Sequence, residues 1–243
     1  MVGSLLLRGM IAGLIAAVLA FGFAYTFGEP EVDYAIGLEE HKAAAAGEAP
    51  EPEIVSRATQ STIGLATGLL VYGAAVGGIF ALVFAYSYGR VTTLGARATS
   101  ALLAVAAFVA VVLVPQIKYP ANPPAVGSPE TIGARTSLFF LLLAVSVAVM
   151  VLAVLLARRL WAGYGPWTAS VIAGAAWLIV IAVVQIALPS VNEVPADFAA
   201  DRLWGFRTTT IGLHAILWVV IGLTFGALAE ARLEPRRRPA VLA

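Results

Sequence analysis

The hydrophobic positions of this chain gather into long, nearly uninterrupted runs separated by shorter polar segments. Six runs are about 17 residues or longer, close to or above the length that a helix needs to cross a hydrocarbon core of about 30 Å. They cover residues 5–27, 60–87, 98–114, 136–157, 167–188 and 208–229. The pattern therefore predicts an all-α integral membrane protein, a single polytopic domain over residues 1–243 with six transmembrane helices.

The first run has one basic residue near its start, Arg8, and so has some features of a secretory signal peptide. It is longer than the apolar region of most signal peptides, and no clear A-x-A cleavage site directly follows it. We therefore interpret this run as a retained transmembrane helix.

Basic residues are unevenly distributed over the segments that connect the runs. One set of connections, together with both termini, holds nine Lys and Arg, whereas the other set holds six basic and twelve acidic residues. Because the side richer in Lys and Arg stays in the cytoplasm, we expect both termini and the basic tail at 230–243 to be cytoplasmic. The acidic loop at 28–59 then faces outward, where its charge either attracts cations or only keeps the segment soluble. A short helix around residues 31–44 is one conformation open to it.

The three outward connections share a pattern that indicates an internal repeat. In each, a span ends near a proline and the chain re-enters through an arginine, Arg57, Arg135 or Arg207, followed within two residues by threonine. We interpret this as three repeated helical hairpins, although prolines and arginines also occupy such places in unrelated membrane proteins. We expect Pro115 and Pro189 to end their helices, and VPQIKYPANPP at 114–124 to form a stiff rim at the outer mouth.

Glycines recur four residues apart, a spacing that places them on one helix face and lets helix backbones approach closely. The pairs are Gly9 and Gly13, Gly64 and Gly68, Gly73 and Gly77, and Gly222 and Gly226. We therefore expect closely packed helices.

The composition narrows the possible chemistry. The chain is 60% hydrophobic and 12% charged, and it contains no cysteine, which excludes disulfides and thiolate metal sites. No phosphate-binding G-x-x-x-x-G-K-[ST] loop, H-E-x-x-H or G-x-S-x-G motif occurs. We predict that the protein is not an enzyme, has no covalently bound cofactor and has no nucleic-acid partner.

His214 is the most specific single candidate for ion binding. It follows Arg207 by seven residues, about 10 Å along a helix, and shares a helical stripe with it. Ionisable groups inside a membrane usually face the bundle interior, and imidazole is a ligand for Co, Ni, Zn and Cu. His214 is therefore the predicted ion-path residue, and a hydrogen bond to a neighbouring helix carbonyl is the alternative. Its candidate partners on the path are Gln185, Asn192, Glu193 and Asp197.

Two polar segments outside the spans are further candidates. EEHK at 39–42 places Glu39, Glu40 and His41 together, either for weak capture of a hydrated cation or as a solvated face. VNEVPADF at 191–198 forms either a cation entry point or an ion-pair network with neighbouring basic residues. The residues expected at the outer mouth and its gate are Lys118, Tyr119, Asn122, Arg135 and Arg207, with Lys118 either pairing with a carboxylate or limiting cation entry.

Several stretches resemble one known family. They include LLLRGMIAGL, FAYTFGEPEVDYAI, VSRATQS, KYPANPP and NEVPADF, and the similarity extends over roughly residues 5–230. The chain resembles CbtA, the predicted cobalt transporter subunit of bacteria and archaea. The resemblance implies a multi-pass protein of the cytoplasmic (inner) membrane that is linked to cobalt or cobalamin supply. It also implies a small, single-span, histidine-containing partner, CbtB. The usual family description has five spans, one fewer than the six counted here.

Two functional hypotheses follow. The favoured one is a membrane subunit that helps Co²⁺ cross the inner membrane, with acidic outer loops that gather the ion and His214 that meets it within the bundle. The rival is a non-transporting accessory subunit of a larger membrane complex. The rival is favoured by the small number of polar side chains in the spans.

Overall fold

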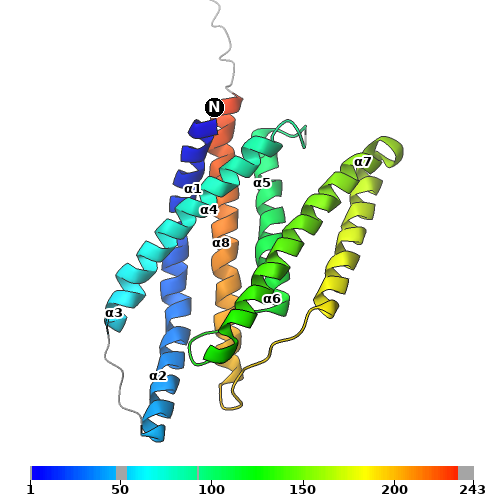
Figure 1. Cartoon of the computed structure of the whole chain (residues 1–243). Coiled ribbons are helices and arrows are strands. Elements are labelled where there is room, and N and C mark those ends of the chain that lie inside the picture. Colours follow the sequence, from blue (N-terminus) through cyan, green and yellow to red (C-terminus); the bar gives the residue numbers. More distant parts are fainter. Residues whose placement is uncertain (1, 48–53, 92, 235–243) are drawn as a thin grey trace, which may run out of the picture. The chain divides into compact units, whose positions relative to one another are not determined.

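The computed structural model describes residues 2–47, 54–91 and 93–234, and within these ranges the chain is helical, without a β-strand. Figure 1 shows the course of these helices. In chain order the elements are α1 (Val2–Phe23), the π-helix η1 (Ala24–Gly28), α2 (Glu29–Ala46), α3 (Arg57–Thr59), the π-helix η2 (Gln60–Gly64), α4 (Leu65–Ser87), α5 (Ala96–Ala107), the π-helix η3 (Phe108–Leu113), α6 (Val114–Lys118), the 3₁₀ helix η4 (Pro129–Thr131), α7 (Ile132–Ala187) and α8 (Ala200–Leu233).

Within the described ranges, five helical runs are long and apolar enough to cross a membrane, which confirms the all-helical membrane class. They are Val2–Ala46, Arg57–Ser87, Ala96–Lys118, Pro129–Ala187 and Ala200–Leu233. The predicted spans 136–157 and 167–188 fall within one run, so the predicted six spans and three repeated hairpins are not confirmed by this count. The acidic segment after the first span contains α2, which confirms the helix expected around residues 31–44.

The longest run, Pro129–Ala187, does not continue as one straight helix. Gly165 adopts φ 74° and ψ 165°, a non-helical conformation inside α7, and Pro166 follows it. Figure 1 shows α7 turning back on itself, so that its two arms run in opposite directions. Glycine suits this position because its missing Cβ allows a positive φ.

The chain divides into two compact units. The first unit comprises residues 1–29, 51–105 and 212–243, and the second comprises residues 30–50 and 106–211.

Glycines bring α1 and α4 into close contact in the first unit. A Cβ added to Gly13 would overlap the carbonyl oxygen of Gly73, and one added to Gly9 would overlap that of Gly77. Two backbones can approach this closely only where side chains are missing. The expected close packing is confirmed at these two pairs, whereas a Cβ on Gly68 would meet nothing within 4 Å.

The rest of the first unit packs around aromatic rings and a second glycine contact. Phe84 and Phe225 are fully buried, and their ring centroids lie 4.9 Å apart. A Cβ on Gly222 would approach the Cβ of Ala104 to 2.5 Å. Beside it, the buried hydroxyl of Ser100 donates to the Gly222 carbonyl oxygen at 2.6 Å. Together these contacts join α4 and α5 to the later part of α8.

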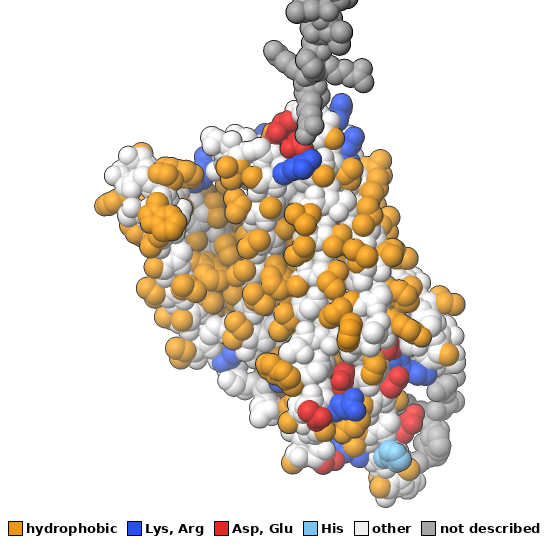
Figure 2. All heavy atoms as spheres, turned by 180° about the vertical axis from the view of Figure 1, so that it is seen from behind, with side chains coloured by type: hydrophobic (Ala, Val, Ile, Leu, Met, Phe, Trp, Pro, Cys, Tyr) orange, Lys and Arg blue, Asp and Glu red, His pale blue; other side chains and the backbone are white. Residues whose placement is uncertain are grey.

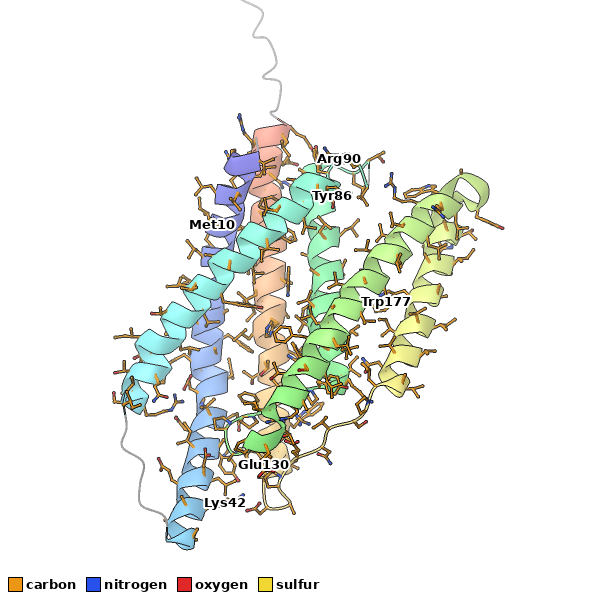
Figure 3. All side chains as sticks on the ribbon, viewed as in Figure 1. Met10, Lys42, Tyr86, Arg90, Glu130 and Trp177 are labelled. Carbon is orange, nitrogen blue, oxygen red and sulfur yellow. The ribbon has the colours of Figure 1, made fainter. Side chains whose placement is uncertain are left out.

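A separate apolar core holds the second unit together. Val114, Tyr119, Leu142 and Ile181 form a buried cluster that draws on the first residue of α6, the residue after α6 and both arms of α7. Trp177, labelled in Figure 3, packs against this cluster. The cluster positions the segments that surround the cavity described below.

One expectation about the prolines is wrong. The helix does not end at Pro115 but continues through α6 to Lys118, two residues before Pro120. The π-helical segment η3 ends at Leu113, two residues before Pro115, and such a wider turn accommodates a residue that lacks a backbone N–H donor. Pro189 behaves as predicted, because α7 ends at Ala187 and Leu188 is extended.

Large hydrophobic side chains remain exposed along the helices, and Figure 2 shows them covering much of the surface in that view. Val71, Phe140 and Leu223 are 66%, 60% and 64% exposed. A surface of this kind suits contact with lipid chains rather than water.

Candidate functional site

A cavity of about 730 Å³ lies within the second unit. Its walls come from the segment after α6, the beginning of α7, the segment after α7 and the early part of α8. The polar and charged lining residues are Tyr119, Asn122, Arg135, Thr136, Asn192, Glu193 and Arg207. The structure therefore brings together four of the five residues predicted for the outer mouth with two of those predicted for the ion path.

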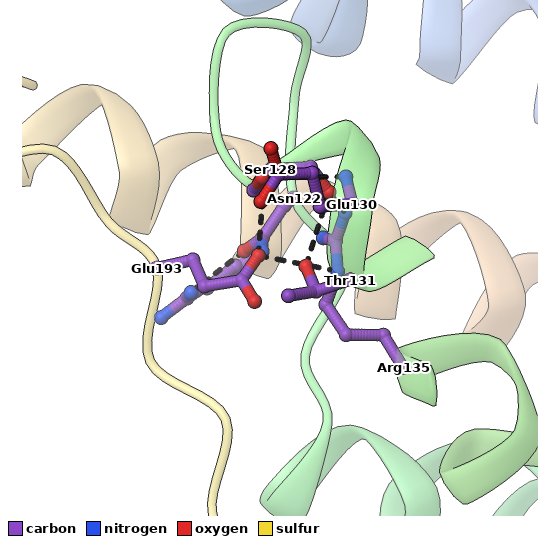
Figure 4. Close-up of polar contacts among 7 residues, drawn as sticks. Asn122, Ser128, Glu130, Thr131, Arg135 and Glu193 are labelled. Atoms are coloured by element: carbon purple, nitrogen blue, oxygen red, sulfur yellow. Dashed lines mark hydrogen bonds and ion pairs between the residues drawn. The ribbon is translucent and has the colours of Figure 1, made fainter. Parts of the chain in front are cut away.

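Glu193 is held on one side of this cavity by three kinds of contact, drawn in Figure 4. Its carboxylate accepts a hydrogen bond from the Ser128 backbone N–H at 2.9 Å and lies 3.3 Å from Nε of Arg135. The Thr131 hydroxyl, the Ser128 N–H and the positive charge of Arg135, in that order, lower the pKa of Glu193. The carboxylate is therefore ionised and already engaged by donors, which disfavours its use as a metal ligand.

Arg207 extends from α8 to the proline-rich segment on another wall. Its Nη2 donates to Oδ1 of Asn122 at 2.8 Å, and its Nε donates to the Ala121 carbonyl oxygen at 3.3 Å. Both acceptors are neutral. The guanidinium therefore holds the 119–126 segment in place while its charge is not balanced by a carboxylate among the residues that the structure describes.

Three further hydrogen bonds fix the two loops that border the cavity. The Tyr119 hydroxyl donates to the Pro189 carbonyl oxygen at 2.8 Å, and Nζ of Lys118 donates to the Ser190 hydroxyl at 3.0 Å. Nε2 of Gln185 donates to the Val114 carbonyl oxygen at 2.8 Å. Burial raises the pKa of Tyr119. Lys118 therefore donates to a hydroxyl and not to a carboxylate, which was one of its two predicted roles. Gln185 supports the helix backbone at Val114.

The predicted cation-capture residues are consecutive on one helix. Glu39, Glu40 and His41 are exposed on α2. Asp197 pairs with Nζ of Lys42 at 2.9 Å, and the hydrogen bond from Lys42 is the first cause that lowers the pKa of Asp197. Glu193 and Asp197 therefore have separate cationic partners, which favours the ion-pair interpretation of VNEVPADF over the entry-point interpretation.

His214 belongs to the first unit. It is partly buried on α8, and its ring meets that of Tyr72 edge to face with centroids 6.4 Å apart. Within the described ranges no group of three or more His, Asp or Glu residues is placed to hold a metal ion. His214 therefore stays a predicted ion-path residue, without a ligand set of carboxylates around it.

Sequence reasoning missed Ser128 and Thr131. The SPET stretch at 128–131 is a recognisable helix start, since the Ser128 hydroxyl accepts from the Glu130 N–H at 3.3 Å. The contact of Ser128 with Glu193 spans 65 residues. No local pattern predicts a contact over that separation.

These features define a multi-pass, all-helical membrane protein with a polar cavity between loops of its second unit. The family model described as "Probable cobalt transporter subunit (CbtA)" matches residues 2–230, so the chain belongs to the CbtA family. Because the family is described as a transporter subunit, the protein is expected to act with other subunits. Neither a curated protein nor a solved structure matches the chain.

Proposed function

We propose that this protein is the membrane-spanning subunit through which Co²⁺ crosses the cytoplasmic membrane of a bacterium or archaeon, in support of cobalamin synthesis. The observation that carries the proposal is the match of the cobalt-transporter family over residues 2–230 of a chain with five long apolar helices. Cobalt is the transported substrate here and not a resident cofactor.

The proposal includes a partner. Within the described residues no cluster of His, Asp and Glu is available for a metal, and a single imidazole such as His214 does not make a selective cobalt site. A small, single-span, histidine-containing subunit of the CbtB type would supply the missing nitrogen ligands. The lipid bilayer and this subunit are therefore the proposed surroundings of the chain.

The proposed topology has six crossings with both termini in the cytoplasm. The 59 residues of Pro129–Ala187 would extend about 90 Å as a straight helix, about three times the hydrocarbon thickness. The non-helical Gly165 divides this run into two arms, each long enough to cross once. Arg158 and Arg159 lie just before the bend, which agrees with a cytoplasmic turn.

The chain has no cysteine, so single introduced cysteines report membrane sidedness without background. Six crossings predict that a cysteine at Gly163 reacts from the cytoplasmic side, and one at Ser61 from the outer side. Labelling of both positions from one side would contradict this topology.

A second candidate function is an accessory subunit that does not itself conduct the ion. It is supported by the absence of a ligand cluster in the described ranges and by the pairing of Glu193 and Asp197 with Arg135 and Lys42. Uptake of radiolabelled Co²⁺ into vesicles separates the two functions. Vesicles with this chain and its small partner should accumulate cobalt faster than vesicles with the partner alone. Equal rates in the two preparations would favour the accessory subunit.

A further inference from the structure

The charge of the cavity in the second unit points to an anion rather than to a cation. Three charged side chains line it: Arg135, Arg207 and Glu193. Arg135 and Glu193 face each other at 3.3 Å and largely cancel. Arg207 contributes the remaining positive charge, because its described partners are the neutral oxygens of Asn122 and Ala121.

Hydrogen-bond donors remain available in the same cavity. The described contacts of Arg207 use its Nε and one N–H of Nη2, and a guanidinium carries further N–H donors in a planar fork. Because Oδ1 of Asn122 accepts from Arg207, the amide N–H₂ of Asn122 is left as a donor. Asn192 adds an exposed amide from another wall. Arginine and amide donors that approach from different segments match the several oxygens of a phosphate group.

One wall of the cavity is apolar and continues onto the surface of α7. Phe139, Phe140 and Ile132 line this side, and Phe140 and Ile132 are 60% and 61% exposed. A phosphate that carries hydrophobic chains, such as a lipid headgroup, would place its polar part among the arginines and its chains along these side chains. A water-soluble phosphate would use the polar part alone.

We propose that this cavity binds the phosphate group of an anionic ligand and that Arg207 is its main anchor. The ligand bridges the proline-rich 119–126 segment, the 191–194 segment and the early part of α8. The phosphate site uses Arg207 as its anchor and not His214, and its existence does not depend on cobalt transport.

The test uses the purified, delipidated full chain and native mass spectrometry. Its three probes are short-chain phosphatidylglycerol, inorganic phosphate and the matching diacylglycerol, which lacks phosphate. We expect one equivalent of phosphatidylglycerol or of inorganic phosphate to bind, with diacylglycerol much weaker. Binding of phosphatidylglycerol alone identifies a lipid headgroup as the source, whereas binding of inorganic phosphate identifies a soluble ligand.

Substitutions test whether the phosphate group binds in this cavity. Arg207→Gln should raise the Kd about tenfold or more, because it removes the charged fork. Arg202→Gln is the matched control, since Arg202 lies on the same helix but outside the cavity and faces Glu31 at 3.6 Å. It should leave the Kd within about twofold, as a distant surface charge does.

A second variant keeps the proposal testable if Arg207→Gln does not fold. Asn192→Asp adds a carboxylate at an exposed position without removing a described hydrogen bond, and it should weaken phosphate binding similarly. The proposal is overturned if neither phosphate probe binds, or if diacylglycerol binds as tightly as phosphatidylglycerol. It is also overturned if every variant that folds, among Arg207→Gln, Asn192→Asp and Arg202→Gln, binds the phosphate probes as tightly as the wild type.

Discussion

Both units of this protein have a buried apolar core, and they differ in the contacts that supplement it. In the first unit, glycines and buried aromatic rings bring helix backbones into direct contact, as between Gly13 and Gly73. In the second unit, charged and polar side chains tie loops to helix ends, as between Glu193 and Ser128. The difference indicates that the two units have different roles. Close packing of helix backbones stabilises the first unit, whereas the second unit keeps polar groups available around a cavity.

The largest expected effect breaks the close packing of the first unit. Gly13→Ala places a methyl group against the backbone of Gly73 and should lower the free energy of unfolding by about 3 kcal/mol. Reversible unfolding in mixed micelles measures the change. Gly22→Ala is the control on the same helix, because a Cβ there meets nothing within 4 Å, and it should change stability by no more than about 0.5 kcal/mol. Equal effects of the two variants would contradict the proposed role of the α1–α4 contact.

A smaller effect should follow from removal of the buried polar contact in the first unit. Ser100→Ala deletes the hydroxyl that donates to the Gly222 carbonyl oxygen and should cost about 1 kcal/mol in the same unfolding assay. Ser137→Ala provides the comparison, because its exposed hydroxyl bonds only within its own helix, to Gly133. A stability loss no greater than that of Ser137→Ala would show that packing alone joins α5 to α8.

In the second unit we expect a local rather than a global effect. Glu193→Gln removes the carboxylate that accepts from the Ser128 N–H, so hydrogen exchange at that amide should accelerate on the order of tenfold. Exchange in the α1–α4 contact should not change. Glu130→Gln, which alters an exposed neighbour, is the control. Exchange that accelerates throughout the chain would contradict the local role of this contact.

The smallest expected effect is a loss of stabilisation at acidic pH. The pKa values of Glu193 and Asp197 in the folded protein lie below their ordinary values of 4.5 and 3.8. The stabilisation that these carboxylates provide is therefore present above the ordinary values and is lost as the pH falls through the lower folded-state values. Carboxyl NMR shifts of the two residues measure this, and a midpoint at or above the ordinary value for either residue would contradict the described contacts.

The sequence predicted the membrane class and the close approach at Gly9, Gly13, Gly73 and Gly77, because these depend on local periodicity and spacing, and the family followed from the resemblance of motifs such as KYPANPP and NEVPADF. It did not predict that the helix continues to Lys118, since the π-helical segment that accommodates Pro115 has no local signal. The arrangement of the cavity also could not be predicted from the sequence. Its lining residues were candidates, but the contacts of Glu193 with Ser128 and of Arg207 with Asn122 connect positions 65 and 85 residues apart.

The most direct test of the account is whether cobalt passage depends on His214. The chain has two histidines, so His41, which is exposed on α2, is a natural control. The measurement is the initial rate of radiolabelled Co²⁺ uptake by vesicles that contain the chain and its small partner. The account predicts that His214→Ala lowers this rate about tenfold or more, as loss of a metal ligand does, whereas His41→Ala leaves it within about twofold. Equal rates for wild type, His214→Ala and His41→Ala would contradict the proposed ion path.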